Sequence, residues 1–203
     1  MTSSGTQTIR HLQQENHRLR GENHSLRDYV ERLQRALKAL VGLQRSLDRI
    51  TPETNVFELI HKILESALDA VDSENGSLLL LDHDSGELVF VEVIGDSREK
   101  LLNYRLPKGT GIAAWAVANR QVRVVEDVRR EPLFTPQVDQ HTGLSTTSLI
   151  CVPLLENDRP LGAIEAVNTR SGRAFTEADK EIIVLVAKLA SEAIVAAEKI
   201  QGG

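Results

Sequence analysis

The sequence has very few of the residues on which several large classes of protein depend. It contains one cysteine, Cys151, which excludes an intramolecular disulfide framework and a cysteine-rich zinc site. No apolar run approaches the roughly 18 residues of a membrane-spanning helix. The polar start MTSSGTQTIR is also unlike a signal peptide. We therefore expect a cytoplasmic protein with no membrane partner.

Positive charge is scarce over most of the chain. Residues 1–50 contain nine Lys/Arg and five Asp/Glu, a net charge of +4, whereas the remainder contains fifteen and twenty-four, a net charge of −9. Phosphate contacts need clustered cations, so we expect no nucleic acid partner. A phosphate-binding loop, a serine nucleophile elbow and the HExxH zinc motif are all missing from the sequence. These absences favour a non-enzymatic protein without a metal site.

A heptad repeat is present in residues 1–50. Each d position is leucine: Leu12, Leu19, Leu26, Leu33, Leu40 and Leu47. The a positions hold Ile9, Asn16, Asn23, Val30, Leu37 and Gln44. Leucine at d favours two parallel strands, and asparagine at a fixes register and strand number at a cost in stability. Two g-position glutamates precede e-position arginines by five residues, the spacing of interchain ion pairs in a parallel dimer: Glu15 with Arg20, and Glu22 with Arg27. The repeat predicts a parallel coiled coil and a homodimer.

Two other interpretations of this helix fit the sequence less well. A basic leucine zipper needs a long cationic helix before the zipper, and only eight residues precede Ile9. Three histidines, His11, His17 and His24, occupy outward heptad positions. A solvated face explains them better than a metal site.

The remaining residues, 51–200, alternate between helix and strand patterns. Thr51 as N-cap and Pro52 at the first helical position predict a helix running to about Val71. Two hairpins are predicted, one turning at residues 83–86 and the other at residues 157–160. Further segments are expected to form a helix (109–120), a short strand (121–127) and a long polar excursion (128–145). A final helix (176–199) is expected to start at Thr176, with Asp179 three residues later. Consecutive hairpins imply a mostly antiparallel sheet flanked by helices, an α+β domain.

Three segments of this domain occur in a distinctive order: KGTGIAAWAV, then DVRREPLFTPQVDQHTGLSTTSLICVPL, then LGAIEAVN followed by FTEAD. Over about residues 52–198 the chain resembles a GAF domain, the small-molecule sensor module of bacterial regulators and cyclic-nucleotide phosphodiesterases. The resemblance implies a GAF-like fold and a small ligand, possibly a cyclic nucleotide, with no other cofactor. A helical coil before the domain is also similar to the family, where such helices join sensors to outputs.

The resemblance to cyclic-nucleotide-binding members implies eight ligand-binding residues: Ser77, Ile112, Ala113, Thr135, Asp139, Thr142, Thr146 and Glu165. Free N–H groups at the start of a helix suit an anion on physical grounds as well. A purely structural role is the alternative for several of these residues. Ser77 could satisfy a strand end, and Glu165 could face solvent. Asp139 or Thr142 could cap the turn at Gly143.

The chain also departs from the nucleotide-binding members. These often carry an Asn-Lys…Phe…Asp-Glu signature with an internal salt bridge that holds the pocket. Here Asn168, Phe175 and Asp179 match, whereas Thr169 and Lys180 replace the Lys and the Glu. That salt bridge therefore cannot form in its usual sense. Nucleotide-binding members also hold the base with an aromatic–acidic pair. The corresponding segment of this chain, Ile-Gly-Asp, does not reproduce that pair.

Two chemistries known among GAF-like proteins need a reactive cysteine. Free-methionine sulfoxide reductases use a nucleophilic thiol with a resolving partner, and phytochrome-type members tether a bilin through a Cys that His usually follows. Cys151 stands alone among strand residues, and the sequence contains no Cys-His pair. We therefore expect a buried, inert thiol and no catalytic residue.

Together these features predict a dimeric regulator whose GAF domain binds a small ligand and transmits its state through the coiled coil. No output domain precedes the end at Gly203, so we expect a protein partner or the coil itself to carry the output. The segment from Pro132 to Thr146 is expected to close over the ligand as a cap. The alternative is a ligand-free scaffold for dimerisation or docking, in which Trp115, Phe134 and nearby leucines would fill the pocket.

Overall fold

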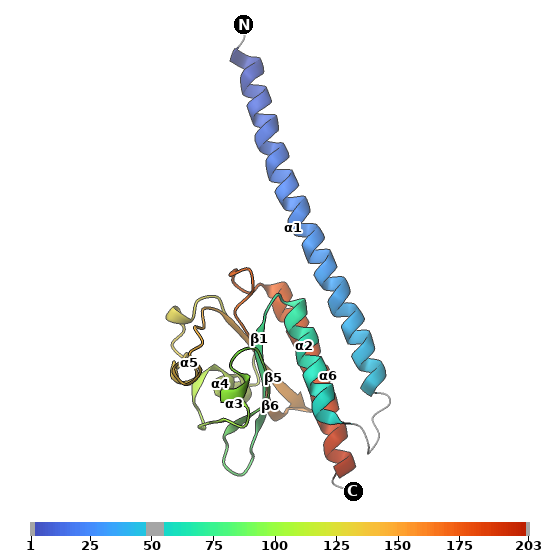
Figure 1. Cartoon of the computed structure of the whole chain (residues 1–203), viewed down its shortest axis with the longest axis vertical. Helices are drawn as coiled ribbons and strands as arrows, with labels where there is room; N and C mark the ends of the chain where they lie inside the picture. Colours follow the sequence, from blue (N-terminus) through green and yellow to red (C-terminus); the bar gives the residue numbers. More distant parts are fainter. Residues whose placement is uncertain (1–2, 48–54, 202–203) are drawn as a thin grey trace.

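A computed structural model describes residues 3–47 and 55–201 of the chain. One sheet forms the centre of an α+β domain, and helices cover both of its faces (Figure 1). A long helix, α1 (Ser3–Leu47), precedes the domain. The expected α+β architecture, an antiparallel sheet flanked by helices, is thus confirmed.

The sheet has six strands in the order β3-β2-β1-β6-β5-β4, and every neighbouring pair is antiparallel. Its centre consists of the two predicted hairpins, which join where β1 pairs with β6. The strands are β1 (Asn75–Leu81), β2 (Leu88–Ile94), β3 (Arg105–Leu106), β4 (Arg123–Val125), β5 (Leu149–Glu156) and β6 (Arg159–Val167).

Two helices, α2 (Val56–Ala70) and α6 (Glu177–Gln201), cover one face of the sheet. The opposite face carries α3 (Arg98–Leu101), α4 (Gly111–Asn119), the 3-10 turn η1 (Val128–Arg130) and α5 (Gln137–Thr142). Among residues 3–47 and 55–201, no helix is long and apolar enough to cross a membrane.

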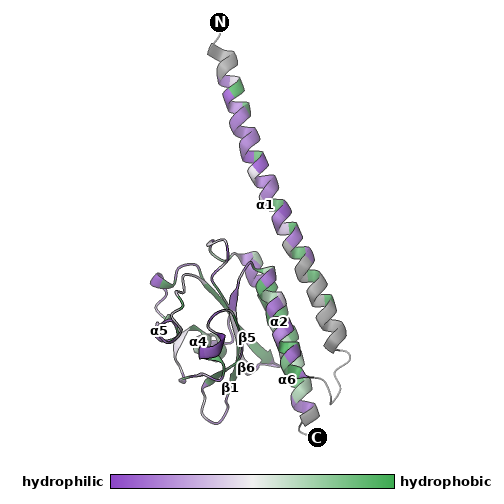
Figure 2. Ribbon diagram, viewed as in Figure 1, coloured by the Kyte–Doolittle hydropathy of each residue, from purple (hydrophilic) through white to green (hydrophobic). Residues whose placement is uncertain are grey.

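Alternate residues of the central strands enter two separate hydrophobic cores. Leu78 and Ile164 pack with α2 and α6 in one core, whereas Leu79 and Ala163 pack with α4 in the other. This division follows from the two-residue period of a strand, which sends successive side chains to opposite faces. Figure 2 shows hydrophobic residues concentrated in the strands and along α2 and α6, and mainly hydrophilic residues along α1.

Side-chain caps define where two of the helices begin. Asn55 caps α2, since its side-chain oxygen accepts hydrogen bonds from the N–H groups of Phe57 and Glu58 at 3.1 and 3.3 Å. The predicted start at Thr51 and Pro52 lies outside the described residues. At α6, the predicted start at Thr176 is confirmed.

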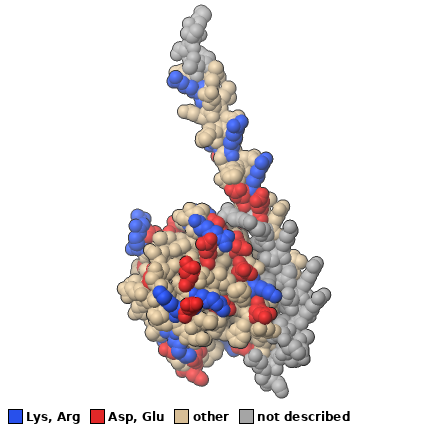
Figure 3. All heavy atoms as spheres, in the orientation of Figure 1, with Lys and Arg blue, Asp and Glu red and all other residues tan. Residues whose placement is uncertain are grey.

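Helix α1 extends away from the domain at its N-terminal end, while its C-terminal part lies along α2 and α6 (Figure 1). The apolar heptad residues are exposed in the single chain: Leu12 is 61% and Leu26 62% exposed. Basic side chains are spaced along the helix, whereas acidic and basic side chains intermix over the visible face of the domain (Figure 3). The long helix is confirmed, and its pairing with a second chain stays a prediction.

Four short elements were not expected from the sequence: α3, β3, η1 and α5. The last two lie within the predicted polar excursion, which therefore contains ordered structure. Segments of two to six residues show too few turns or alternations for periodicity to identify them. They form here because their neighbours supply hydrogen-bond partners.

Candidate ligand pocket

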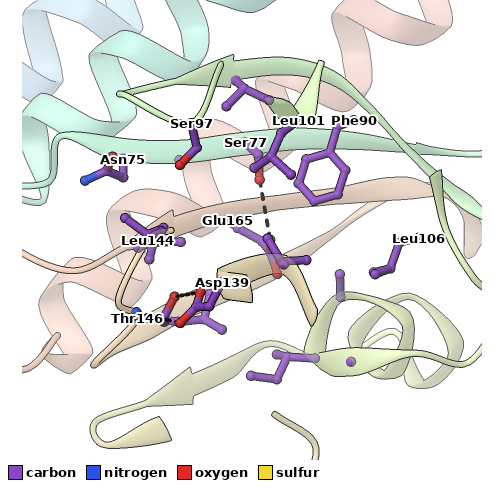
Figure 4. Close-up of a pocket in the computed structure, with 18 of the residues that line it drawn as sticks. Asn75, Ser77, Phe90, Ser97, Leu101, Leu106, Asp139, Leu144, Thr146 and Glu165 are labelled. Atoms are coloured by element: carbon purple, nitrogen blue, oxygen red, sulfur yellow. Dashed lines mark hydrogen bonds between the residues drawn. The ribbon is translucent and has the colours of Figure 1, made fainter. Parts of the chain in front are cut away.

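A pocket lies between the sheet and the layer formed by α3, α4 and the segment around α5 (Figure 4). Its volume is about 80 Å³. One water molecule needs about 10–15 Å³ on this measure, so the pocket holds several waters or a small organic molecule. Its walls are mainly apolar, with Phe90, Leu101, Leu106 and Leu144 among the lining residues.

The floor of the pocket is a row of side chains that crosses three strands. Ser77 on β1 lies opposite Glu165 on β6, and Glu165 lies opposite Cys151 on β5. The Ser77 hydroxyl donates to Glu165 Oε2 at 3.4 Å. Burial raises the pKa of Glu165 to about 7, although hydrogen bonds from Cys151 and Ser77 oppose the rise. Glu165 thus faces the pocket rather than the outer solvent, and it changes charge near neutral pH.

Cys151 is the third member of this row, but unlike Ser77 and Glu165 it does not line the pocket. The side chain is fully buried. Burial raises its pKa well above the ordinary value, and the neighbouring Glu165 carboxyl raises it further. The sulfur is therefore held as a thiol, the less reactive form.

The first turn of α4 forms one wall of the pocket through Gly111, Ile112 and Ala113. The N-cap residue, Thr110, makes no side-chain hydrogen bond to this turn. The first N–H groups of a helix have no acceptor within the helix, so these amides are available to a ligand. Gly111 has φ = +78°, a conformation that favours glycine. A Cβ atom there would also lie 3.3 Å from the hydroxyl of Thr135.

The cap contributes Thr135, Asp139 and Thr146 to the lining. The Asp139 carboxylate accepts hydrogen bonds from the N–H and the hydroxyl of Thr146 at 2.8 and 2.6 Å. Asp139 therefore joins α5, in the middle of the cap, to its C-terminal end. Figure 4 shows this pair at one side of the pocket and the Ser77–Glu165 pair at its floor.

Thr142 is the one candidate residue that the structure does not bring to the pocket. Its hydroxyl donates to the carbonyl oxygen of Val138 at 2.8 Å and accepts from the N–H of Leu144 at 3.1 Å. The side chain thus stabilises the end of α5, as the capping alternative implied. Gly143 follows with φ = +82° and ends the helix.

Contacts with α3 anchor the cap, and the sequence did not predict them. Lys100 Nζ donates to the carbonyl oxygen of Thr142 at 2.6 Å, and a ring nitrogen of His141 lies 3.1 Å from the carbonyl oxygen of Lys100. The His141 ring also stacks on Tyr104 with 4.9 Å between ring centroids. The C-terminal end of α5 is therefore attached to α3 and to Tyr104.

Sequence reasoning also missed two polar lining residues, Asn75 and Ser97. The Ser97 side chain is 7% exposed and, although the residue is the N-cap of α3, it makes no capping hydrogen bond. Figure 4 shows its oxygen among the lining groups. Phe134 lines the pocket, but Trp115 lies outside it beneath the guanidinium of Arg123. The pocket keeps its open volume with Phe134 in place.

An ion pair near α6 takes the place of the salt bridge that the sequence lacks. Arg173 donates to both oxygens of Asp179, at 2.5 and 3.0 Å, while the Thr169 hydroxyl donates to the carbonyl oxygen of Arg173 at 2.7 Å. Burial alone would raise the pKa of Asp179, but hydrogen bonds from Arg173 and Thr176 lower it below its ordinary value. The cation is Arg173, four positions after Thr169, so it lies outside the position at which the family signature has its Lys.

Comparisons with known proteins agree with this architecture. The model of the GAF domain family matches residues 53–195. A probable 3',5'-cyclic phosphodiesterase, pde-5, of Caenorhabditis elegans is 25% identical over 138 residues, which are 64% of this chain and 19% of that protein. The chain thus spans about a fifth of the length of that relative.

Two solved structures illustrate the likeness of fold. The GAF domain of a phosphoenolpyruvate-protein phosphotransferase from Coxiella burnetii has a TM-score of 0.68 at 19% identity, covering 83% of this chain and 97% of its own. The free methionine-R-sulfoxide reductase of Neisseria meningitidis, solved with its substrate, has a TM-score of 0.66 at 22% identity, covering 81% and 90%. The family match over most of the chain shows that this protein belongs to the GAF domain family.

Proposed function

We propose that this protein is a dimeric, non-enzymatic regulator whose GAF domain binds a small ligand and passes the bound state through α1 to a protein partner. The observation that supports this most strongly is the pocket itself. Unsatisfied amide groups of α4, the carboxyl group of Glu165 and the hydroxyl of Ser97 converge in one largely apolar cavity. Convergent polar groups in an apolar pocket are typical of small-molecule sites.

The exposed stripe on α1 supports the dimer. Leucines at d positions are 50% exposed or more at Leu12, Leu19 and Leu26. Burial of such side chains against a second helix is favourable by about 25 cal/mol for each Å² of apolar surface. A second copy of α1 presents the same stripe in the same register, with Asn16 and Asn23 able to pair across the seam.

The contacts of α2 supply a route from the pocket to α1. Helix α2 packs on the sheet and also lies against α1. Buried Glu92 pairs with Arg98, which directly follows the pocket residue Ser97, and Glu92 Oε1 lies 3.3 Å from the ring of His61 on α2. A ligand that moves α3 would therefore change the contacts of Glu92, which include the one to His61 on α2.

The environment of Cys151 supports a non-enzymatic role. A nucleophilic cysteine needs exposure and a lowered pKa, whereas this thiol is buried and its pKa is raised. The cysteine-dependent sulfoxide reductase activity named for one of the similar proteins is therefore not proposed for this chain.

The proposal is tested by identifying small molecules that copurify with the full chain, using mass spectrometry after denaturation. Recovered compounds, together with cyclic AMP and cyclic GMP, are then titrated while hydrogen exchange is followed. A ligand should slow exchange in residues 110–114 and 132–146. It should also stabilise the domain by about 2.7 kcal/mol at a hundredfold excess over its dissociation constant.

The competing function is a ligand-free scaffold for dimerisation or docking. That alternative predicts that cap amides exchange as slowly as those of β5 and β6 in the free protein, and that no compound changes this. Such a result would replace the sensor proposal with the scaffold proposal.

A further inference from the structure

The charged groups around the pocket restrict the ligands that it accepts. No Lys, Arg or His is among the residues that line the pocket, whereas two carboxyl side chains are, Glu165 and Asp139. The nearby cations have other partners: Arg98 pairs with Glu92, and Lys100 donates to a backbone carbonyl of the cap. A purely anionic ligand would meet carboxyl groups without any balancing side-chain cation.

The two carboxyl groups differ in how much hydrogen-bonding capacity they have left. Both oxygens of Asp139 accept short hydrogen bonds from Thr146. Glu165 has a long contact of 3.4 Å with the Ser77 hydroxyl and the Cys151 thiol beside it. A carboxylate has about four acceptor sites, so Glu165 retains capacity for a ligand donor.

Donors occupy a different part of the same pocket. The first N–H groups of α4 lack a capping side chain, and the hydroxyl groups of Thr135 and Ser97 make no side-chain hydrogen bond with the part of the chain that the structure describes. Ser97 is more than nine-tenths buried as a residue, and its hydroxyl is accessible from the pocket that it lines. These groups suit the oxygens of a small anion.

We propose that the ligand is a small zwitterion of the α-amino acid class, with its ammonium group at Glu165 and its carboxylate at the α4 amides. This inference rests on the proposed function, because it assigns a ligand class to the same pocket. Phe90, Leu101 and Leu106 would contact an apolar side chain. The volume of about 80 Å³ suits a molecule of this size better than a nucleotide.

The charge state of Glu165 gives the proposal a thermodynamic signature. An ammonium group favours the ionised carboxyl, so binding lowers the pKa of Glu165 from its value of about 7 in the empty pocket. The other titratable groups near it are Cys151, which remains protonated at neutral pH, and Asp139, which is held by Thr146. Binding at pH 7 should therefore release a fraction of a proton, and affinity should rise between pH 6 and pH 8.

The first test uses the full chain and the twenty common free amino acids in thermal-shift and calorimetric titrations. The strongest binder is compared with two matched analogues, one lacking the ammonium group and one lacking the carboxylate. Each analogue should bind about tenfold or more weakly, because each loses a charge-assisted hydrogen bond. Calorimetry in buffers of different ionisation enthalpy should detect the proton release.

The second test uses Glu165→Gln, with the exposed Glu126→Gln as matched control. Glu165→Gln should weaken the amino acid about tenfold and abolish proton release while leaving the analogue without ammonium unaffected. Glu126→Gln should change neither. Should Glu165→Gln not fold, Ser97→Ala in combination with the analogue comparison keeps the test intact.

Two outcomes separate this inference from the proposed function. If no amino acid binds, or the deaminated analogue or a cyclic nucleotide binds as tightly, the zwitterion is excluded while the sensor remains. If neither amino acids, nucleotides nor copurified compounds alter exchange in residues 132–146, both proposals fail.

Discussion

Arg173 and Asp179 form a two-point ion pair that closes the loop between β6 and α6. Nucleotide-binding GAF members often have a Lys at the position that Thr169 occupies here. The Asp179 carboxylate also accepts hydrogen bonds from the N–H and hydroxyl of Thr176. One buried acid thus serves as the partner of a loop arginine and as part of the first turn of α6. Its position next to the helix start also suits the helix dipole.

Replacing Arg173 with Met should destabilise the domain by about 1–3 kcal/mol at neutral pH, because Asp179 would lose its ion-pair partner while remaining buried. The lowered pKa of Asp179 means that its contribution is fully present above the unfolded-state pKa and is lost as pH falls through the folded-state pKa. Urea unfolding should therefore show a large difference in stability between wild type and Arg173→Met at pH 7. That difference should become smaller below pH 4. Arg129→Met, in an exposed pair with Asp127, is the control and should change stability little, because solvent screens an exposed pair.

The stability of the ligand-free protein should also depend on Glu165. Its pKa is raised from 4.5 to about 7, so the folded state favours the protonated form, and wild-type stability should fall as pH rises from about 4.5 through 7. Glu165→Gln removes this penalty and should gain up to about 3 kcal/mol relative to wild type at pH 8, with little of that gain at pH 4. Denaturant titrations at both values test this. An equal stability difference between Glu165→Gln and wild type at pH 4 and pH 8 would contradict this prediction.

The a-position asparagines should determine how many helices associate. Asn16→Ile combined with Asn23→Ile should raise thermal stability while allowing trimers or tetramers. The matched control is His17→Ile with His24→Ile, one residue further along at outward positions, which should not change the strand number. Light scattering measures the assembly, and a wild-type monomer at micromolar concentration would contradict the predicted dimer.

Cys151 should be dispensable for ligand binding. Cys151→Ala should cost about 1 kcal/mol through lost packing. Ligand-induced changes in hydrogen exchange should persist in this variant. Loss of binding or of a measurable activity in a variant that remains folded would contradict an inert role for this thiol.

Asp139 should hold the cap together before any ligand arrives. Because its carboxylate accepts two hydrogen bonds from Thr146, Asp139→Ala should speed hydrogen exchange in residues 137–147 of the free protein. Thr142→Ala should act on the C-terminal end of α5 alone, since its contacts are with Val138 and Leu144. Unchanged exchange in Asp139→Ala would show that other contacts, such as those of Lys100, are sufficient.

The larger elements could be predicted because each carries a local signal over many residues. The long helix α1, the two hairpins and the Thr176 start of α6 are all confirmed at the expected places, whereas the coiled coil that the heptads predict stays a prediction. Seven of the eight candidate residues line one pocket, although whether they bind a ligand stays a prediction. That convergence followed from the GAF resemblance rather than from periodicity.

Other features depend on residues far apart in the chain, and local patterns carry no information about them. Thr142 and Asp139 are polar residues in the same segment, yet one caps α5 and the other joins α5 to the C-terminal end of the cap. Arg173 assumes the role of a missing cation because the loop brings it to Asp179.

The sequence by itself determined the long helix with its apolar stripe, the antiparallel sheet and the membership of the GAF domain family, since these depend on short-range periodicity and on the order of motifs. Only the tertiary structure decided that Glu165 faces a largely apolar pocket whose lining, among the residues that the structure describes, includes no Lys, Arg or His. Register between β1, β6 and β5 places that carboxyl beside Ser77 and Cys151. The burial that results, and not the residue type, moves its pKa toward neutrality.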